Sequence, residues 1–141
     1  MFINDMSTIN RYSNIFINRS LANKNITSAE HYVLMFLFGK EEVTQDEIAQ
    51  YFALDKGSIS KTLYSLEMKS YVKRIENPED RREKKVTLTE LGITSFKSTH
   101  ELLEKWHEEI MFNISKEELA IFNKVINQMA KNAVTAIKNL E

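Results

Sequence analysis

The fold is indicated by residues 43–92, VTQDEIAQYFALDKGSISKTLYSLEMKSYVKRIENPEDRREKKVTLTELG. This stretch combines two short helical patterns with two alternating patterns that flank a charged segment. Thr44, with a glutamate three residues later, forms a capping-box pattern that predicts a helix over 45–52. Asp55 is a candidate N-cap for a second helix over 56–69. Because only two residues separate the first helix from Asp55, the pair predicts a helix-turn-helix.

The second predicted helix has two chemically different faces. Ile59, Leu63 and Leu66 are spaced four and then three residues apart, so they form one apolar stripe that faces the core. The opposite face contains small hydroxyl residues, glycine and lysine, and it has no acid, which suits close approach to phosphates and base edges. The candidate DNA-binding residues of this helix are Lys56, Gly57, Ser58, Ser60, Lys61 and Tyr64. For any single lysine here, a solvated surface position remains the alternative.

Two alternating runs follow this helix, at 71–76 and 85–89. They predict a pair of strands joined by a long tip, NPEDRREK, at 77–84. A helix-turn-helix followed by such a hairpin is a winged helix, in which the tip inserts into a groove of nucleic acid. The alternative for the tip is a solvated loop with a weak surface ion pair.

The flanking segments predict further helices. Two more capping boxes begin at Thr27 and Ser115, and they predict helices near 28–39 and 116–139. Apolar periodicity predicts two others, over 2–22 and 90–111. The long helices extend beyond a winged-helix core, so their apolar stripes need another partner, and a second copy of the chain in a two-fold dimer is the simplest one. A helical monomer is the alternative.

Composition excludes several classes of protein. The absence of cysteine excludes disulfides, thiol catalysis, thiol-based redox sensing and cysteine-ligated zinc. No glycine-rich phosphate loop, no nucleophile with a base and no cluster of metal ligands is evident, so neither an enzyme nor a cofactor is expected. The longest apolar run, Tyr32 to Phe38, is too short to span a membrane, so we expect a cytoplasmic protein without a membrane partner. The net charge is −1, yet residues 56–85 contain nine Lys/Arg against five Asp/Glu, a local basic footprint.

The order of predicted elements and three sequence stretches resemble the MarR family of transcription regulators. NPEDRREKKVTLTELG, residues 77–92, resembles the family's wing signature, with Asp80 and Arg82 at its Asp-x-Arg positions and Leu88, Thr89 and Gly92 following. Residues 43–74 resemble its two DNA-reading helices and first wing strand, and ITSAEHYVL resembles the start of its second helix. Ser70 departs from the family pattern, which often has glycine there, and a left-handed conformation at this position would cost serine some strain.

The resemblance implies a mainly α fold with a small β-hairpin wing, in which N- and C-terminal dimerisation helices flank a winged helix-turn-helix core. It implies one domain over 1–141, with the DNA-binding region at about 28–89 and dimerisation helices at about 2–25 and 90–141. The implied function is a homodimeric regulator, usually a repressor, that binds a pseudo-palindromic double-stranded DNA operator. A small aromatic or phenolic anion is the expected class of effector.

Within the wing, we expect Arg82 and Arg81 to enter the minor groove, where narrow A·T-rich segments deepen the negative potential. Asp80 is expected to hold the arginine in an extended rotamer through a charge-assisted pair. Four other cations are candidates for contact with the DNA backbone, namely Lys73, Arg74, Lys84 and Lys85.

Three interpretations remain open from sequence. The candidate effector pocket consists of Tyr12, Phe16, Arg19 and His31, although aromatic residues at helical spacing also form ordinary cores. A zinc-responsive regulator is an alternative because His31, His100 and Glu104 are metal-ligand types, although a stacked or core histidine also explains His31. A winged-helix module that binds a protein instead of DNA is a further alternative, and the salt dependence of binding would distinguish it.

Overall fold

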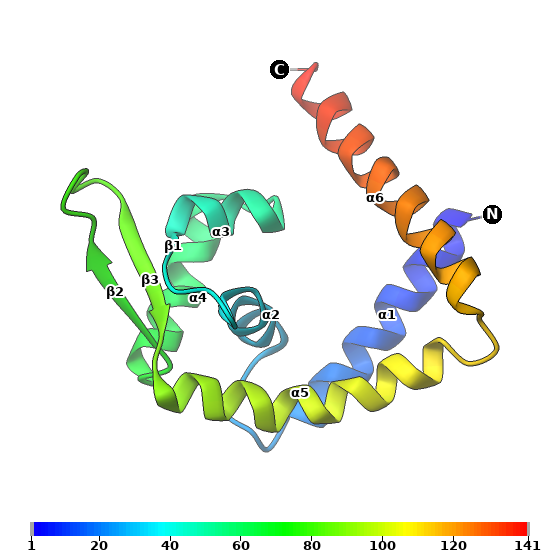
Figure 1. Cartoon of the computed structure of the whole chain (residues 1–141), viewed down its shortest axis with the longest axis horizontal. Coiled ribbons are helices and arrows are strands. Elements are labelled where there is room, and N and C mark those ends of the chain that lie inside the picture. Colours follow the sequence, from blue (N-terminus) through cyan, green and yellow to red (C-terminus); the bar gives the residue numbers. More distant parts are fainter. Residues whose placement is uncertain (1, 141) are drawn as a thin grey trace. The chain divides into compact units, whose positions relative to one another are not determined.

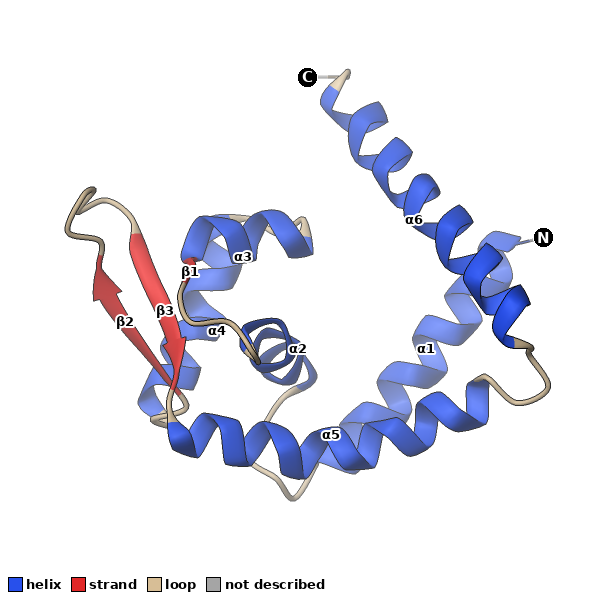
Figure 2. Cartoon of the chain, viewed as in Figure 1, coloured by secondary structure: helices blue, strands red, loops and turns tan. Residues whose placement is uncertain are grey.

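The computed structural model describes residues 2–140, which form a mainly helical fold with one small sheet (Figures 1 and 2). Its elements, in chain order, are α1 (Phe2–Leu21), α2 (Ser28–Leu37), β1 (Val43–Thr44), α3 (Gln45–Phe52), α4 (Lys56–Met68), β2 (Val72–Glu76), β3 (Lys84–Leu88), α5 (Glu90–Ile110) and α6 (Lys116–Lys138). The predicted fold class is confirmed, and the six predicted helices all begin at the expected residue. The chain forms two compact units that divide after Trp106.

Side-chain caps explain why the helices begin where they do. The three predicted capping boxes are all present, at Thr27, Thr44 and Ser115, each with its glutamate bonded back to the cap backbone. Asp55 caps α4 by accepting a 2.8 Å hydrogen bond from the backbone N–H of Ser58. These contacts satisfy N–H groups that have no partner within the helix.

The core of the first unit contains buried side chains from α1, α2, α3, α4, α5 and the sheet. The predicted inner stripe of α4 is confirmed, since Ile59, Leu63 and Leu66 are almost fully buried. Ile48 and Ala49 of α3 are also buried. Burial of such side chains contributes about 1.5–3 kcal/mol each and fixes the direction of the outer face of α4.

The wing belongs to a three-stranded antiparallel sheet in the order β1-β3-β2 (Figure 2). The predicted hairpin is present, with Val72 opposite Leu88 and Glu76 opposite Lys84. The sequence analysis missed β1, whose Val43 pairs with Val86 of β3. A strand of two residues is too short for a period-two pattern, and only its pairing with β3 defines it.

Four described non-glycine residues take a positive φ, namely Asn25, Ala53, Ser70 and Asn113, and two of them lie in turns of the winged-helix region. Ala53 takes φ 51° in the turn between α3 and α4, and Ser70 takes φ 61° between α4 and β2. Ser70 therefore takes the left-handed conformation that the sequence analysis considered for this position. The N–H of Tyr71 bonds to the carbonyl of Leu66 at 2.9 Å, so the serine closes α4 in the way a C-terminal glycine usually does.

The junction between β3 and α5 explains the Leu-Thr-x-x-Gly pattern at residues 88–92. The hydroxyl of Thr89 donates to the carbonyl of Ser70 at 2.7 Å and accepts from the N–H of Gly92 at 3.0 Å. The N–H of Thr89 bonds to the carbonyl of Tyr71 at 3.0 Å. Gly92 lies so close to Tyr71 that a Cβ atom there would be 2.0 Å from this carbonyl oxygen. The start of α5 therefore packs directly against the turn between α4 and β2.

Aromatic contacts join α1 to α5 within the first unit. Phe16 stacks on Trp106 with ring centroids 4.9 Å apart, and the indole N–H of Trp106 donates to Ser13 at 3.0 Å. The earlier part of α1 leaves large apolar side chains exposed, among them Phe2, Ile3, Met6, Ile9 and Ile15.

The second unit contains α6, in which no described residue is buried. Its exposed apolar side chains are Ile121, Phe122, Val125, Val134 and Ile137. None of the helices within residues 2–140 is both long enough and apolar enough to cross a membrane.

Candidate nucleic-acid interface

The outer face of α4 is open to solvent. Gly57, Lys61 and Tyr64 are exposed, Lys56 and Ser58 are exposed at its first turn, and Ser60 is half-buried at its margin. No acidic side chain of α4 is fully exposed, because its one acid, Glu67, is half-buried and pairs with Arg74 at 2.6 Å. The face therefore presents hydroxyl and lysine donors without a competing carboxylate from the same helix.

Ser58 forms part of the N-terminal cap of α4, because its backbone N–H and its hydroxyl both bond to the carboxylate of Asp55. Its hydroxyl donates to the second carboxylate oxygen of Asp55 at 2.6 Å. The hydrogen bonds from the Ser58 hydroxyl and backbone N–H lower the pKa of Asp55. Ser58 can therefore accept a hydrogen bond from DNA but has no free proton to donate, unlike Ser60 and Lys61.

The tip of the wing is a hydrogen-bonded turn. Asn77 is buried and its side-chain amide donates to Glu83 at 2.7 Å, while its side-chain oxygen accepts from the N–H of Glu79. Asp80 accepts the backbone N–H of Arg82 at 2.9 Å. The expected pair between Asp80 and an arginine side chain is wrong in this structure, because the carboxylate orders the backbone of the turn instead. Arg81, Arg82 and Lys84 are exposed around this turn.

Two of the candidate backbone-contacting cations have partners within the protein. Arg74 donates to Glu67 through two of its nitrogens, and Lys85 pairs with Glu42 at 2.9 Å. Glu42 raises the pKa of Lys85 by hydrogen bonding and by its charge. The sequence analysis missed both pairs because the partners lie on other elements. Lys73 remains exposed.

A pocket of about 180 Å³ lies where the wing meets the helix-turn-helix. It is lined by Gln45, Asp46, Lys56, Ser60, Arg82, Glu83 and Lys84. The structure therefore brings together two candidates from α4 and two from the wing, which are more than twenty residues apart in sequence. Gln45 was not predicted, because a single glutamine at a helix start has no distinctive sequence signal.

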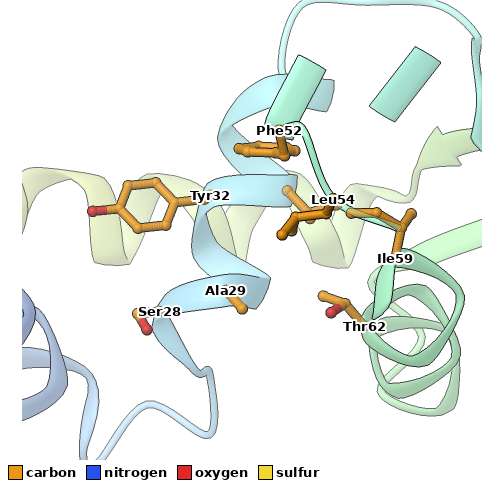
Figure 3. A pocket seen from close by; sticks show the side chains of 8 residues that line it. Ser28, Ala29, Tyr32, Phe52, Leu54, Ile59 and Thr62 are labelled. Atoms are coloured by element: carbon orange, nitrogen blue, oxygen red, sulfur yellow. The ribbon is translucent and has the colours of Figure 1, made fainter. Parts of the chain in front are cut away.

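A second pocket, of about 230 Å³, lies between α2 and the helix-turn-helix (Figure 3). Its lining is apolar, with Ala29 and Val33 of α2 facing Phe52, Leu54 and Ile59. The hydroxyl of Tyr32 points away from these side chains in Figure 3. The pocket contains no cation, so it does not match the anion site expected from sequence.

The four predicted effector residues do not line either of these pockets. Tyr12 and Arg19 are exposed on α1, and Phe16 packs on Trp106. His31 is buried in the core, 1% exposed, and stacks on Phe96 with ring centroids 5.5 Å apart. The alternative interpretation of His31 as a stacked core histidine agrees with this placement.

The ring of His31 joins α2 to α5. Nδ1 of His31 and the hydroxyl of Thr99 share a hydrogen bond at 2.8 Å. The same hydroxyl lies within hydrogen-bonding distance of the backbone carbonyls of Ser95 and Phe96 in its own helix. Burial, and then the nearby charge of His100, lower the pKa of His31 to about 4.

This lowered pKa of His31 predicts acid sensitivity. The folded state favours the neutral ring, so the stabilisation is complete above the ordinary pKa of 6.5 and is lost as the pH falls from 6.5 towards 4. We expect the free energy of unfolding to fall by roughly 2 kcal/mol between pH 7 and pH 5 through this residue. Urea denaturation at the two pH values measures the change. His31→Phe should abolish most of the pH dependence, and a variant that keeps it would contradict this assignment.

Two of the three residues named as metal-ligand types, His100 and Glu104, are in contact. Nε2 of His100 lies 3.3 Å from Glu104, one turn along α5. Within residues 2–140, no three side chains of the ligand-forming types come close enough together to hold a metal ion.

Comparison with known proteins places the site in a family context. A family model described as "MarR family" matches residues 24–83. The multiple antibiotic resistance protein MarR of Escherichia coli is 26% identical over 122 residues, which covers 86% of this chain and 85% of that protein. The crystal structure of a MarR transcriptional regulator from Methanosarcina mazei superposes with a TM-score of 0.82 at 26% identity, covering 96% of this chain and 98% of that one. A mutant MarR from E. coli complexed with operator DNA gives a TM-score of 0.78 at 25% identity, covering 89% and 91%.

Proposed function

Since the chain belongs to the MarR family of winged-helix transcription regulators, we propose that it binds double-stranded DNA sequence-specifically as a homodimer. In this proposal α4 lies in the major groove and the β2–β3 tip enters the adjacent minor groove. The observation that carries it is the exposed face of α4, which has lysine and hydroxyl donors, no fully exposed acid and the wing cations beside it. The DNA-bound structure of the E. coli mutant supports it by fold.

The proposed contacts differ in kind. Ser60 and Lys61, followed by Lys56 and Tyr64, are proposed to meet base edges or phosphates in the major groove. Gly57 allows close approach because it has no side chain. In the minor groove, Arg82 and Arg81 are proposed to follow the negative potential, while Asp80 shapes the turn and Lys84 meets the backbone.

The apolar side chains that α1 and α6 leave exposed support the proposed homodimer. Phe2, Ile3, Met6 and Ile9 on α1 are each more than 40% exposed, as are Ile121, Phe122 and Val125 on α6. Burying such side chains against a second copy would stabilise the assembly at about 25 cal/mol per Å² of apolar surface. Two DNA-binding units related by a two-fold axis match a pseudo-palindromic operator. The chain is then one MarR-type domain over 1–141, with about 28–89 binding DNA and about 2–25 and 90–141 dimerising.

The proposal has two further parts. The DNA-bound protein represses transcription, and binding of a small aromatic or phenolic anion releases it from the DNA. Among the four candidate residues, Arg19 would provide the positive charge, because the pKa of His31 is lowered and its ring is neutral near pH 7. Tyr12 and Phe16 would contact the aromatic ring of the ligand.

Replacing Arg82 by alanine tests the DNA-binding proposal. Fluorescence anisotropy would compare DNA from upstream of the protein's own gene with scrambled DNA at two salt concentrations. We expect wild type to prefer its own upstream DNA, to lose affinity steeply with salt and to bind one duplex per two chains. Arg82→Ala should weaken binding roughly 10- to 100-fold, since a base-edge or groove arginine contributes about 1–3 kcal/mol.

Lys97→Ala is the matched control, because it removes one positive charge from an exposed position on α5. It should change the affinity by less than about 2-fold, as expected for a charge outside the interface. Equal weak binding of wild type to both DNAs, unchanged by Arg82→Ala, would contradict the proposal. A module that binds a protein would then explain the exposed face better.

A further inference from the structure

The apolar pocket between α2 and the helix-turn-helix reaches from the core of the first unit to its surface (Figure 3). Two core residues line it, Val33 and Ile59, which are 3% and 1% exposed. Leu54 also lines it and is 51% exposed. A small molecule can therefore enter from solvent and contact apolar side chains that belong to the core.

The volume of this pocket limits the size of its occupant. An apolar cavity of about 150 Å³ holds benzene, a single ring. The pocket measures about 230 Å³, about half as large again, so it suits a molecule of two fused rings. Drug-sized ligands usually occupy about 300 Å³ or more, so they are too large for it.

The lining of the pocket determines the charge of its occupant. Of the residues described within 2–140, those that line it include no acid, lysine, arginine or histidine. A carboxylate or an ammonium group placed there would lose its water without gaining an opposite charge, which is costly. The occupant is therefore neutral, unlike the anion proposed to meet Arg19.

The hydroxyl of Thr62 gives the pocket a hydrogen-bond acceptor. This hydroxyl donates its proton to the carbonyl of Ser58 at 3.2 Å, so the lone pairs of its oxygen can accept another bond. In Figure 3 the Thr62 side chain extends from α4 towards Ala29 of α2. A ligand between these two residues can donate to the Thr62 oxygen through one N–H or O–H group.

We propose that this pocket binds a neutral molecule of two fused rings, held by apolar contacts and by one hydrogen bond donated to the hydroxyl of Thr62. The ligand contacts α2, α3 and α4, since lining residues come from all three helices. The inference goes beyond the proposed function, because binding requires no DNA. None of the four candidates for the anion site lines this pocket.

Three probes of similar size separate the features of the proposed ligand. Indole has two fused rings and one N–H group, benzofuran has nearly the same shape without a donor, and indole-3-carboxylate has a negative charge. Isothermal titration calorimetry on the full chain at pH 7 measures the affinity of each probe. We expect saturable binding of one indole per chain, and binding of indole-3-carboxylate that is weaker by at least about 10-fold.

Substitutions at Ala29 place the ligand in the pocket. Ala29 lines the pocket at an exposed position, so a larger side chain there can fill the space without disturbing the core. Ala29→Phe should weaken indole binding by at least about 10-fold, because the added ring occupies the volume of the ligand. Ala29→Ser, the matched control, leaves the volume open and should change the affinity by less than about 2-fold. Circular dichroism verifies that both variants fold.

Thr62→Val tests the hydrogen bond, since valine has nearly the same shape as threonine and lacks the acceptor. The ratio of the indole affinity to the benzofuran affinity should fall roughly 2- to 10-fold in this variant. Comparing the two probes within one variant cancels any general change of the pocket. This measurement also decides the question if Ala29→Phe does not fold.

Four results would overturn the inference. Absence of saturable indole binding to wild type would leave the pocket without a ligand of this class. Unchanged indole binding in folded Ala29→Phe would place the ligand elsewhere. Equal affinities for indole and indole-3-carboxylate would show that the site accepts an anion. An unchanged ratio in Thr62→Val would remove the hydrogen bond, and none of these results affects the proposed function.

Discussion

Gly92→Ala is expected to lower the free energy of unfolding by about 3 kcal/mol, the upper end for overpacking a close contact. The added Cβ would meet the carbonyl oxygen of Tyr71 at 2.0 Å, and it would also approach two other backbone atoms of that residue. Backbone cannot move aside as the end of a side chain can. The same carbonyl accepts the N–H of Thr89, so any shift also strains the junction between β3 and α5.

Urea denaturation followed by circular dichroism measures this effect, and Gly57→Ala is the control. At Gly57 a Cβ would meet only a side-chain oxygen of Asp55, at 3.1 Å. Alanine is favoured over glycine within a helix by about 1 kcal/mol, so this variant should be as stable as wild type or more stable. Similar losses in the two variants would show that the close approach at Gly92 has no special importance. Because Gly92 supports the wing through Tyr71 and Thr89, its variant should also lose DNA affinity.

Lys69→Met is expected to lower the free energy of unfolding by about 3–5 kcal/mol, because it leaves a buried carboxylate unpaired. Glu30 is 3% exposed, and Lys69 pairs with it at 2.7 Å. Burial alone would raise the pKa of Glu30, but hydrogen bonds from Lys69, Ser65 and the backbone of Thr27 lower it overall. This cluster links the start of α2 to the end of α4 and so holds the orientation of the proposed DNA-reading helix.

Two further variants show whether the loss comes from the buried charge. Lys85→Met breaks the pair with Glu42, whose side chain is 47% exposed, and should cost no more than about 1 kcal/mol. Adding Glu30→Gln to Lys69→Met removes the unpaired charge and should recover a large part of the stability. Equal losses for Lys69→Met and Lys85→Met, or no recovery in the double variant, would contradict this account. Chemical denaturation at pH 7 gives the free energy of unfolding of wild type, Lys69→Met, Lys85→Met and the Lys69→Met/Glu30→Gln double variant.

The helices could be predicted from the sequence because their causes are local. A cap and its glutamate lie three residues apart, so Thr27, Thr44 and Ser115 mark helix starts without knowledge of the rest of the chain. The inner stripe of α4 is set by a 3.6-residue period, and this also defines its outer face. The candidate residues of α4 were found in this way, whereas those of the wing were found from the charge of the hairpin tip and from the resemblance to the MarR family.

The missed features depend on residues far apart in the chain. β1 exists because Val43 meets Val86, and Lys85 is paired because Glu42 lies beside it. Asp80 bonds to a backbone N–H within the turn, where charge alone suggested a pair with an arginine side chain. Composition and spacing do not indicate which donor an acid will find in three dimensions.

The sequence by itself determined the mainly helical winged-helix fold, the exposed lysine and hydroxyl face of α4 and the charged wing. Short-range caps and apolar periods are sufficient for these features. Only the tertiary structure decided which cations are free, since ion pairs occupy Arg74 and Lys85 and leave Arg82 and Lys84 at the pocket where the wing meets the helix-turn-helix. It also brought Gln45 to that pocket with an unpaired oxygen, because hydrogen bonding in a folded chain depends on distances between elements that no local pattern specifies.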